Sequence, residues 1–272
     1  MLRSVRSLLG RKDRPVPATE APEATARRDA DAPRPDSPTY VVGDIHGRAD
    51  LLELMLELID AHIGGTGARD PRLVFVGDYV DRGPDSAEVL LRLRELTRDL
   101  PRNVTCLMGN HDRMMLDFLK DPATRGPRWL RAGGTRTLAS FGIDPTPLGS
   151  GTSPDTYRAV GRQLRDALPE GHEAWLSDLP LSWHSGNLWV VHAGADPAHP
   201  MQDQSARVLL WGHPEFESDP RGDGVWIVHG HVEAELPHAR DGRIAVDTAA
   251  WSSGRLTACA IRPDGRHDFL QT

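Results

Sequence analysis

The chain has 272 residues, of which 39% are hydrophobic, and this is enough to bury a sizeable core. No segment approaches the roughly 18 continuous apolar residues of a membrane span, so we expect no stable membrane insertion. The 32 basic and 39 acidic residues give a formal net charge of −7, which argues against a general nucleic-acid-binding surface. Both cysteines, Cys106 and Cys259, lie in apolar, strand-like runs. We therefore expect buried free thiols and a cytoplasmic protein.

The beginning of the chain differs in composition from the rest. Residues 1–37 are rich in proline, alanine and charged residues, and such a segment buries too little apolar surface to offset its ordering entropy. This composition predicts a disordered tail, followed by a single domain over residues 38–272. The alternative is a short membrane-surface anchor, built from the few apolar residues at the start of the chain and the arginines between them.

Three apolar runs in the first half of the domain each lead into a glycine and a group of polar residues. The three sequences are Tyr40–Val42 before Gly43-Asp44-Ile45-His46-Gly47, Leu73–Val76 before Gly77-Asp78-Tyr79-Val80-Asp81-Arg82-Gly83, and Val104–Met108 before Gly109-Asn110-His111-Asp112. Helical patterns follow over 51–63, 86–96 and 113–120, and Asp85 with Glu88 matches a capping box. This βαβαβ order predicts a mainly parallel sheet with right-handed crossovers.

The middle of the chain lacks strands of comparable strength. Residues 127–141 and 154–179 have helical patterns, separated by a loop rich in Gly, Pro, Ser and Thr. We expect residues 121–187 to form a helical, cap-like insertion over the active-site edge of the sheet. Strand patterns then return at 188–191, 225–228, 243–246 and 256–261. Because no long helix separates the last three, we expect them to form a second, more antiparallel sheet.

The polar residues that follow these strands are predicted to meet at one edge. Parallel strands deliver the loops at their carboxyl ends to the same edge, where open α/β sheets bind ligands. Across the early and late strand ends, the residues with oxygen or imidazole groups are Asp44, His46, Asp78, Asn110, His192 and His231. His229 lies on the same strand face as His231 and is the alternative at that position. Carboxylate and imidazole without thiolate suit Mn, Fe or Zn.

Taken together, the motifs Gly-Asp-x-His-Gly, Gly-Asp-x-x-Asp-Arg-Gly, Gly-Asn-His-Asp, His-Ala-Gly and Gly-His closely resemble the phosphoprotein phosphatase family of calcineurin-like metallophosphoesterases. The resemblance covers residues 39–263 in order. The short chain and its Gly-Asn-His-Asp motif are similar to the bacterial and phage branch of serine/threonine protein phosphatases. The resemblance implies an α/β fold, a four-layer αββα sandwich of two packed mixed sheets, with the helical insertion over the active-site edge.

The resemblance also implies a dinuclear metal centre. One carboxylate is shared and the other ligands are divided between two divalent ions: Asp78 is shared, Asp44 and His46 bind the first ion, and Asn110, His192 and His231 bind the second. Two cations about 3.5–4 Å apart need such a shared anionic ligand. Mn²⁺ is the expected metal, with Fe or Zn as alternatives, and a bridging hydroxide would attack phosphorus directly.

The same resemblance assigns roles to the other residues of the motifs. His111 would donate a proton to the leaving group, and Asp81 would orient its ring. Arg82 and Asn110 would hold phosphate oxygens, a task for which a planar guanidinium is well shaped. His213 stands where the family usually has a second phosphate-binding arginine. It is a further phosphate-binding candidate. In the alternatives, the phosphate contact is made by Arg207, Arg131 or Arg136, the substrate preference differs from that of the family, or His213 is structural.

These residues predict a metal-dependent phosphomonoester hydrolase. The leading hypothesis is a serine/threonine protein phosphatase that acts on phosphoproteins or on small phosphoesters. The alternative is a dinucleoside-polyphosphate hydrolase or nucleotide phosphatase, because relatives with the same fold and ligands carry out that chemistry. Their usual first loop has Gln where His46 stands. A third hypothesis is a non-enzymatic, phosphate-binding scaffold. Degenerate scaffolds are expected to lose His111, Asp81 or a metal ligand, and this chain keeps them all.

Overall fold

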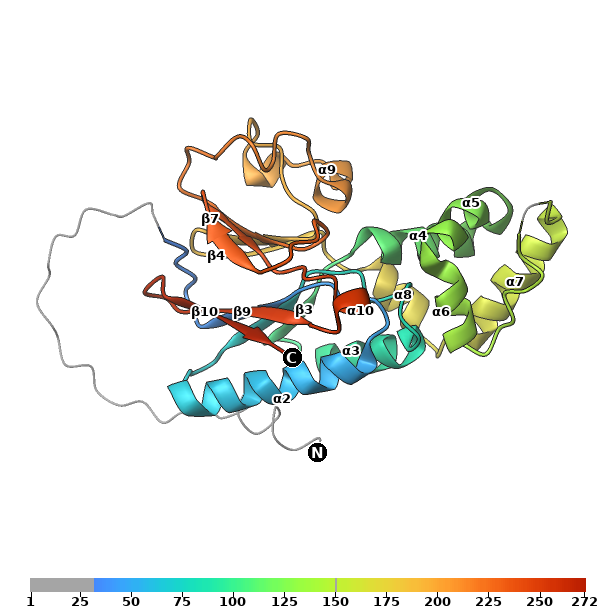
Figure 1. Cartoon of the computed structure of the whole chain (residues 1–272), viewed down its shortest axis with the longest axis horizontal. Helices are drawn as coiled ribbons and strands as arrows, with labels where there is room; N and C mark the ends of the chain where they lie inside the picture. Colours follow the sequence, from blue (N-terminus) through green and yellow to red (C-terminus); the bar gives the residue numbers. More distant parts are fainter. Residues whose placement is uncertain (1–31, 150) are drawn as a thin grey trace, which may run out of the picture.

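The computed structural model describes residues 32–149 and 151–272. Two five-stranded sheets pack face to face, with long helices on the outer face of the first sheet (Figure 1). Most of the predicted tail, residues 1–31, lies outside the described residues. At its described end, the backbone N–H groups of Arg34 and Asp36 donate to Asn187 and Ser185 at 2.6 and 2.9 Å. Within the described ranges, no helix combines the length and apolar character needed to cross a membrane.

The first sheet carries the early motifs. In spatial order its strands are β10 (His267–Gln271), β9 (Thr257–Ile261), β1 (Thr39–Val42), β2 (Arg72–Phe75) and β3 (Val104–Cys106). Strands β1, β2 and β3 are parallel, and the crossover helices are α2 (Ala49–Thr66) and α3 (Ser86–Asp99). The predicted βαβαβ start is confirmed. The antiparallel strands β9 and β10 extend this sheet beyond β1.

The second sheet differs from the predicted one. Its order is β4 (Ser182–Ser185), β5 (Leu188–Val191), β6 (Trp226–His229), β8 (Arg243–Ala245) and β7 (His238–Arg240). The three central strands, β5, β6 and β8, are parallel, and only the edge strands are antiparallel. The prediction of a more antiparallel second sheet was therefore wrong. Residues 256–261 were also predicted in the wrong sheet. They form β9, which pairs with β1, from the opposite end of the chain, in the first sheet.

Alternate residues of the strands pack into different cores. In β1, Tyr40 and Val42 face the core beneath the helices, with Leu52 of α2. Val41, between them, faces the second sheet and packs with residues such as Val190. A strand buried on both faces needs apolar residues at every position. This is why the first runs of the sequence are continuously apolar.

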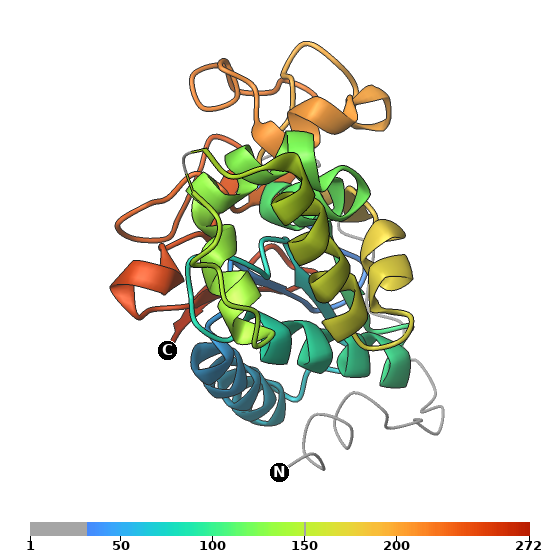
Figure 2. The same cartoon turned by 90° about the vertical axis from the view of Figure 1, so that its right-hand side faces the viewer.

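A helical segment follows β3 and lies in front of the strand ends (Figure 2). Its elements are α4 (Asn110–Lys120), α5 (Pro122–Trp129), a π-helical turn (Leu130–Gly134), α6 (Thr135–Ser140), α7 (Pro154–Ala167) and α8 (His172–Ser177). The helix predicted over 127–141 begins earlier and is interrupted at Gly133, which has φ 118°. The helix predicted over 154–179 is divided by Gly171, which has φ 78°. Strand β4, within 121–187, was missed.

The outer layer on the second sheet is thin. It contains a 3₁₀ turn (Met201–Asp203), α9 (Ala206–Trp211) and loops. From the sheet, Trp189 and Val191 pack against Met201, Leu209 and Phe216 of this layer. The α/β sandwich with two packed mixed sheets is confirmed, and its fourth layer is reduced to short elements.

Two local predictions had different outcomes. Cys106 and Cys259 are buried free thiols, as expected, and burial raises the pKa of both. Asp85 does precede α3, but its side chain makes no capping hydrogen bond. The start of α3 was therefore predicted correctly and its capping box was not. The short helix α10 (Ala250–Ser253) comes just before β9 in the chain.

Candidate metal centre

Loops from both sheets meet at the edge of the sheets that the helical segment covers. In the first sheet, the backbone N–H of His46, after β1, donates to the carbonyl of Asp78, after β2, at 2.8 Å. In the second sheet, the N–H of Gly230, after β6, donates to the carbonyl of His192, after β5, at 2.8 Å. These backbone bonds fix the loops relative to one another, so the side chains they carry are held in place.

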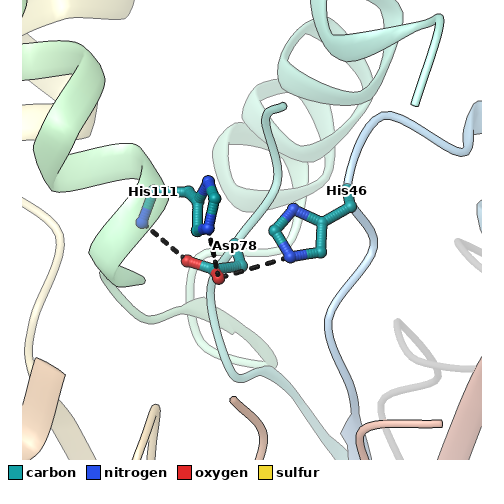
Figure 3. A group of neighbouring side chains, drawn as sticks. All are labelled: His46, Asp78 and His111. Carbon is teal, nitrogen blue, oxygen red and sulfur yellow. Dashed lines mark hydrogen bonds and ion pairs between the residues drawn. The ribbon is translucent and has the colours of Figure 1, made fainter. Parts of the chain in front are cut away.

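Asp78 lies at the centre of this edge and is 1% exposed. Its Oδ2 is 3.4 Å from His46 Nε2 and 4.0 Å from His111 Nε2, and its Oδ1 accepts the backbone N–H of His111 at 2.9 Å (Figure 3). On the other side, Oδ1 is 3.5 Å from His192 Nε2. Asp78, His192 and His231 form a second group whose potential ligand atoms all lie within 4.8 Å of one another. One carboxylate is thus shared by two groups of imidazoles.

The two imidazoles nearest to Asp78 are neutral and correctly oriented for metal binding. Nδ1 of His46 is 2.8 Å from the carbonyl of Val80, and Nδ1 of His192 is 3.1 Å from that of Val76. Since a carbonyl only accepts hydrogen bonds, Nδ1 carries the proton in each ring, and Nε2 keeps its lone pair. Burial lowers the pKa of His46 to about 3 and that of His192 to about 4. Both lone pairs therefore face the Asp78 carboxylate.

The contact between His192 and Asn110 tests whether this site fits a cation. His192 Nε2 lies 2.8 Å from Oδ1 of Asn110, the first residue of α4. With the ring proton on Nδ1, this contact joins two lone pairs, which repel unless a positive charge lies between them. Neutral imidazole, amide oxygen and carboxylate are common ligands of divalent transition metals. The donor set of this site therefore fits a divalent metal ion.

Asp44 adds a further carboxylate beside the second sheet. It is buried and accepts the backbone N–H of His231 at 3.2 and 3.3 Å from its two oxygens. A Cβ at Gly230 would overlap this carboxylate, so only glycine fits there. Burial, followed by the charges of Asp247 and Asp78, raises the pKa of Asp44 well above its ordinary value. An ionised Asp44 is therefore costly unless positive charge lies nearby, and a divalent cation would supply that charge.

Backbone strain is concentrated in the same loops. Non-glycine residues with φ between 45° and 73° are rare, because the left-handed region crowds the side chain. Such values cost free energy and are maintained only where surrounding contacts fix them, often at functional sites. The predicted site residues with φ in this range are His46, Asp78, Asp81, Arg82 and His231.

His111 and Asp81 form a hydrogen-bonded pair next to Asp78. His111 Nδ1 lies 2.7 Å from Oδ2 of Asp81, which is fully buried. Although burial acts in the opposite direction, the charges of Asp78 and Asp81 raise the pKa of His111. The protonated imidazole is thereby favoured, and this is the form that donates a proton.

Two residues of the helical segment also hold Asp81, and no sequence motif indicated either of them. Trp129, at the end of α5, donates from Nε1 to the two carboxylate oxygens of Asp81 at 3.1 and 3.0 Å. Thr137 in α6 donates from Oγ1 at 2.6 Å. The helical segment therefore supports the His111–Asp81 pair directly, in addition to covering the sheet edge.

Asp112 is a third residue whose role was missed. Its carboxylate accepts the backbone N–H groups of Gly109, Asp78 and Tyr79 at 3.0, 2.8 and 3.0 Å. Burial, with the nearby charge of Asp78, raises its pKa to about 7. A carboxylate three residues after a glycine at a helix start is a sequence signal for N-terminal capping. Here it also ties the Asp78 loop to α4.

The remaining predicted residues lie at the rim or away from the centre. Arg82 is partly exposed and bonds Glu233 at 2.8 Å. His213 lies after α9, and its Nε2 is 3.6 Å from the Asp196 carboxylate. The ring of His229 packs edge-on against Phe216, with centroids 4.9 Å apart. His231 is therefore the histidine of this motif that groups with Asp78.

The sequence of the chain matches a known protein family. Residues 37–235 match the model of the calcineurin-like phosphoesterases. The asymmetrical bis(5'-nucleosyl)-tetraphosphatase PrpE of Oceanobacillus iheyensis is 25% identical over 238 residues, which cover 80% of this chain and 86% of that relative. The symmetrical bis(5'-nucleosyl)-tetraphosphatase of Aromatoleum aromaticum is 29% identical over 245 residues, which cover 85% of this chain and 70% of that relative.

Solved structures have the same fold. The crystal structure of a candidate diadenosine tetraphosphatase is similar with a TM-score of 0.57 and 23% identity, covering 87% of this chain and 95% of that one. A protein serine/threonine phosphatase from Saccharomyces cerevisiae is similar with a TM-score of 0.54 and 17% identity, covering 87% of this chain and 80% of that one. At these identities the structures establish the fold alone.

Proposed function

Because this chain belongs to the calcineurin-like phosphoesterase family, we propose that it is a metal-dependent hydrolase of dinucleoside tetraphosphates. The choice of substrate is supported by one observation. Relatives that align with 80% or more of the chain, from two different bacteria, are both named bis(5'-nucleosyl)-tetraphosphatases. This order of hypotheses reverses the one from the motifs, in which the serine/threonine protein phosphatase came first.

The residues of the centre fit two divalent cations, with Mn²⁺ as the proposed metal. The shared ligand would be Asp78, the ligands of one ion would be Asp44 and His46, and those of the other Asn110, His192 and His231. When bound, the cations lower the pKa of water and neutralise charge on the phosphate. The neutral imidazoles of His46 and His192 keep their ligand nitrogens unprotonated near neutral pH.

The other residues act on the substrate itself. His111, held by Asp81, would give a proton to the leaving oxygen. Arg82 would hold phosphate oxygens after leaving Glu233, with its planar fork matching two oxygens at once. In a dinucleoside tetraphosphate the leaving group is a nucleotide phosphate, whose second pKa is about 6. Such a group departs with less need of a proton than a serine alkoxide does.

A serine/threonine protein phosphatase is the second candidate. His46 favours this candidate, since dinucleoside-polyphosphate hydrolases of the resembled family usually have Gln at that position of the Gly-Asp-x-His-Gly motif. The His111–Asp81 pair, with its hydrogen bond of 2.7 Å, also suits an alkoxide leaving group. Its natural substrate would be a phosphoserine or phosphothreonine side chain.

The test compares the two substrates directly. The full chain with added Mn²⁺ is assayed on diadenosine tetraphosphate and on a phosphoserine peptide, and kcat/KM is measured for both. We expect at least roughly tenfold higher kcat/KM on the dinucleotide, equivalent to about 1.4 kcal/mol of transition-state binding. Chromatography of the products separates ATP with AMP from two molecules of ADP, which defines the bond that is cleaved.

Controls assign the activity to the proposed site. Asp78→Asn and His111→Asn should each reduce turnover, while Asp264→Asn, at an exposed carboxylate paired with Arg266, should not. A higher kcat/KM on the peptide would replace the proposal with the protein phosphatase. No metal-dependent turnover of either substrate would favour a phosphate-binding scaffold.

A further inference from the structure

An exposed tryptophan lies beside the proposed phosphate-binding arginine. Trp251, in α10, is 39% exposed. The guanidinium carbon of Arg82 lies over its ring, 5.2 Å from the ring centroid. One oxygen of Glu233 accepts both the indole N–H of Trp251, at 3.1 Å, and a guanidinium N–H of Arg82, at 2.8 Å. The ring is therefore held in a fixed orientation while much of it remains open to solvent.

This exposure is unusual for the described part of the chain. Among the described residues, the exposed large hydrophobic side chains are four leucines and Trp251, so Trp251 is the one aromatic among them. An indole ring exposes a large apolar area, and its N–H is already bonded to Glu233. What remains available is the part of the flat ring surface that Arg82 does not cover. A flat aromatic surface in a fixed orientation is suited to stacking with another planar group.

The position of α10 places this surface next to the metal centre. Ala249, just before α10, has φ 53° and donates its N–H to Asp247, whose charge acts on Asp44. The side chain of Arg48 donates to the carbonyl of Ala250 at 3.0 Å and so holds the start of the helix. Arg82, whose guanidinium lies over the ring, follows Asp81 directly in sequence, so the ring is linked to the centre through the Arg82 side chain.

We propose that Trp251 binds a nucleobase of the substrate. This inference rests on the proposed function and specifies how that site recognises a nucleotide. The base stacks on the open part of the indole, while Arg82 covers the other part and reaches the phosphate of the same nucleotide. Glu233 positions both groups, and an incoming phosphate takes its place on the guanidinium. A cation, an indole and a base stacked in this way attract one another through cation–π and stacking interactions.

The test compares two ligands that differ only by a nucleoside. Isothermal titration calorimetry of the full chain with Mn²⁺ measures Kd for AMP and for inorganic phosphate. We expect the parent protein to bind AMP roughly tenfold to a hundredfold more tightly, the range for stacking of one base. Trp251→Leu should remove this preference and leave the Kd for phosphate within about twofold. Trp251→Phe, which keeps an aromatic ring, should retain part of the preference.

A second arginine–tryptophan pair provides the matched control. Arg94 lies over Trp175, 5.9 Å from the ring centroid, between α3 and α8. Trp175→Leu should keep the full preference for AMP. The inference is overturned if the parent binds AMP no more tightly than phosphate, or if Trp251→Leu keeps the preference.

The two proposals can fail separately. If the preference for AMP depends on Trp251 but diadenosine tetraphosphate is not turned over, the tetraphosphatase proposal is rejected and the base-binding role is kept. Turnover of diadenosine tetraphosphate with an unchanged KM in Trp251→Leu would reject the base-binding role and keep the tetraphosphatase.

Discussion

The buried centre and the exposed rim of the site are built from different interactions. In the centre, Asp78 is 1% exposed and His192 is fully buried, and their neighbours are fixed by backbone hydrogen bonds. At the rim, the Arg82 side chain is 30% exposed, and its contacts with Glu233 and Trp251 are open to water. Charges interact strongly where water is excluded and weakly where it is not. In the proposed function, the centre therefore carries out the chemistry, and the rim adjusts which phosphoester is bound.

The largest expected effect follows from changing the shared carboxylate. Asp78→Asn should lower kcat/KM by on the order of a thousandfold or more, because an amide cannot replace the anionic ligand and several kcal/mol of charge stabilisation depend on the bound cations. Metal content, measured by inductively coupled plasma spectrometry, should fall as well. If the variant kept both its metal and its activity, the buried centre would not be where the chemistry occurs.

A second effect separates the two candidate substrates. His111→Asn should reduce kcat by roughly 10²–10⁴-fold on a phosphoserine peptide, the usual contribution of a general acid. The loss should be clearly smaller on diadenosine tetraphosphate, because its leaving phosphate needs less protonation. Steady-state kinetics on both substrates measure the ratio of the two losses. Equal losses would mean that His111 acts in binding and does not protonate the leaving group.

The helical segment should affect the centre less strongly. Trp129→Phe removes one donor from the buried Asp81 carboxylate, which should cost about 1–3 kcal/mol of stability. We also expect roughly a tenfold lower kcat, since His111 is less well oriented. Thermal denaturation and kinetics measure the two effects, and Trp175→Phe serves as the control. An unchanged kcat would limit Trp129 to packing.

The smallest effect is expected at the rim. Glu233→Gln weakens the exposed ion pair with Arg82, and such pairs contribute about 0–1 kcal/mol. The KM for diadenosine tetraphosphate should fall by less than about fivefold, because Arg82 is released more easily to the phosphate, and kcat should not change. Glu173→Gln, which alters the exposed pair with Arg165, is the matched control. A loss of kcat as large as that in His111→Asn would remove the distinction between rim and centre.

The centre could be predicted from sequence because each of its residues lies a few positions after its own strand. Asp44, Asp78 and Asn110 each follow a glycine that follows an apolar run, so local patterns are sufficient to place them. The pairing of β9 with β1 has no such local pattern, since the two strands lie at opposite ends of the chain. This is why the sheet that contains 256–261 was predicted wrongly.

Contacts between residues far apart in the sequence could not be predicted from local patterns either. Trp129 and Thr137 lie in a segment predicted as helical, but nothing in its periodicity indicates that either side chain bonds Asp81. Glu233 and Trp251 likewise meet Arg82 only in the folded chain. Asp112 differs, because its position after Gly109 carried a capping signal that could have identified it.

Whether Asp78 is shared by two divalent cations can be measured by anomalous diffraction from crystals of the full chain grown with Mn²⁺, collected at the manganese absorption edge. We predict two anomalous peaks, one on each side of the Asp78 carboxylate, with one next to His46 and the other next to His192 and Asn110. A single peak, or peaks that do not contact Asp78, would show that this carboxylate does not bridge two cations.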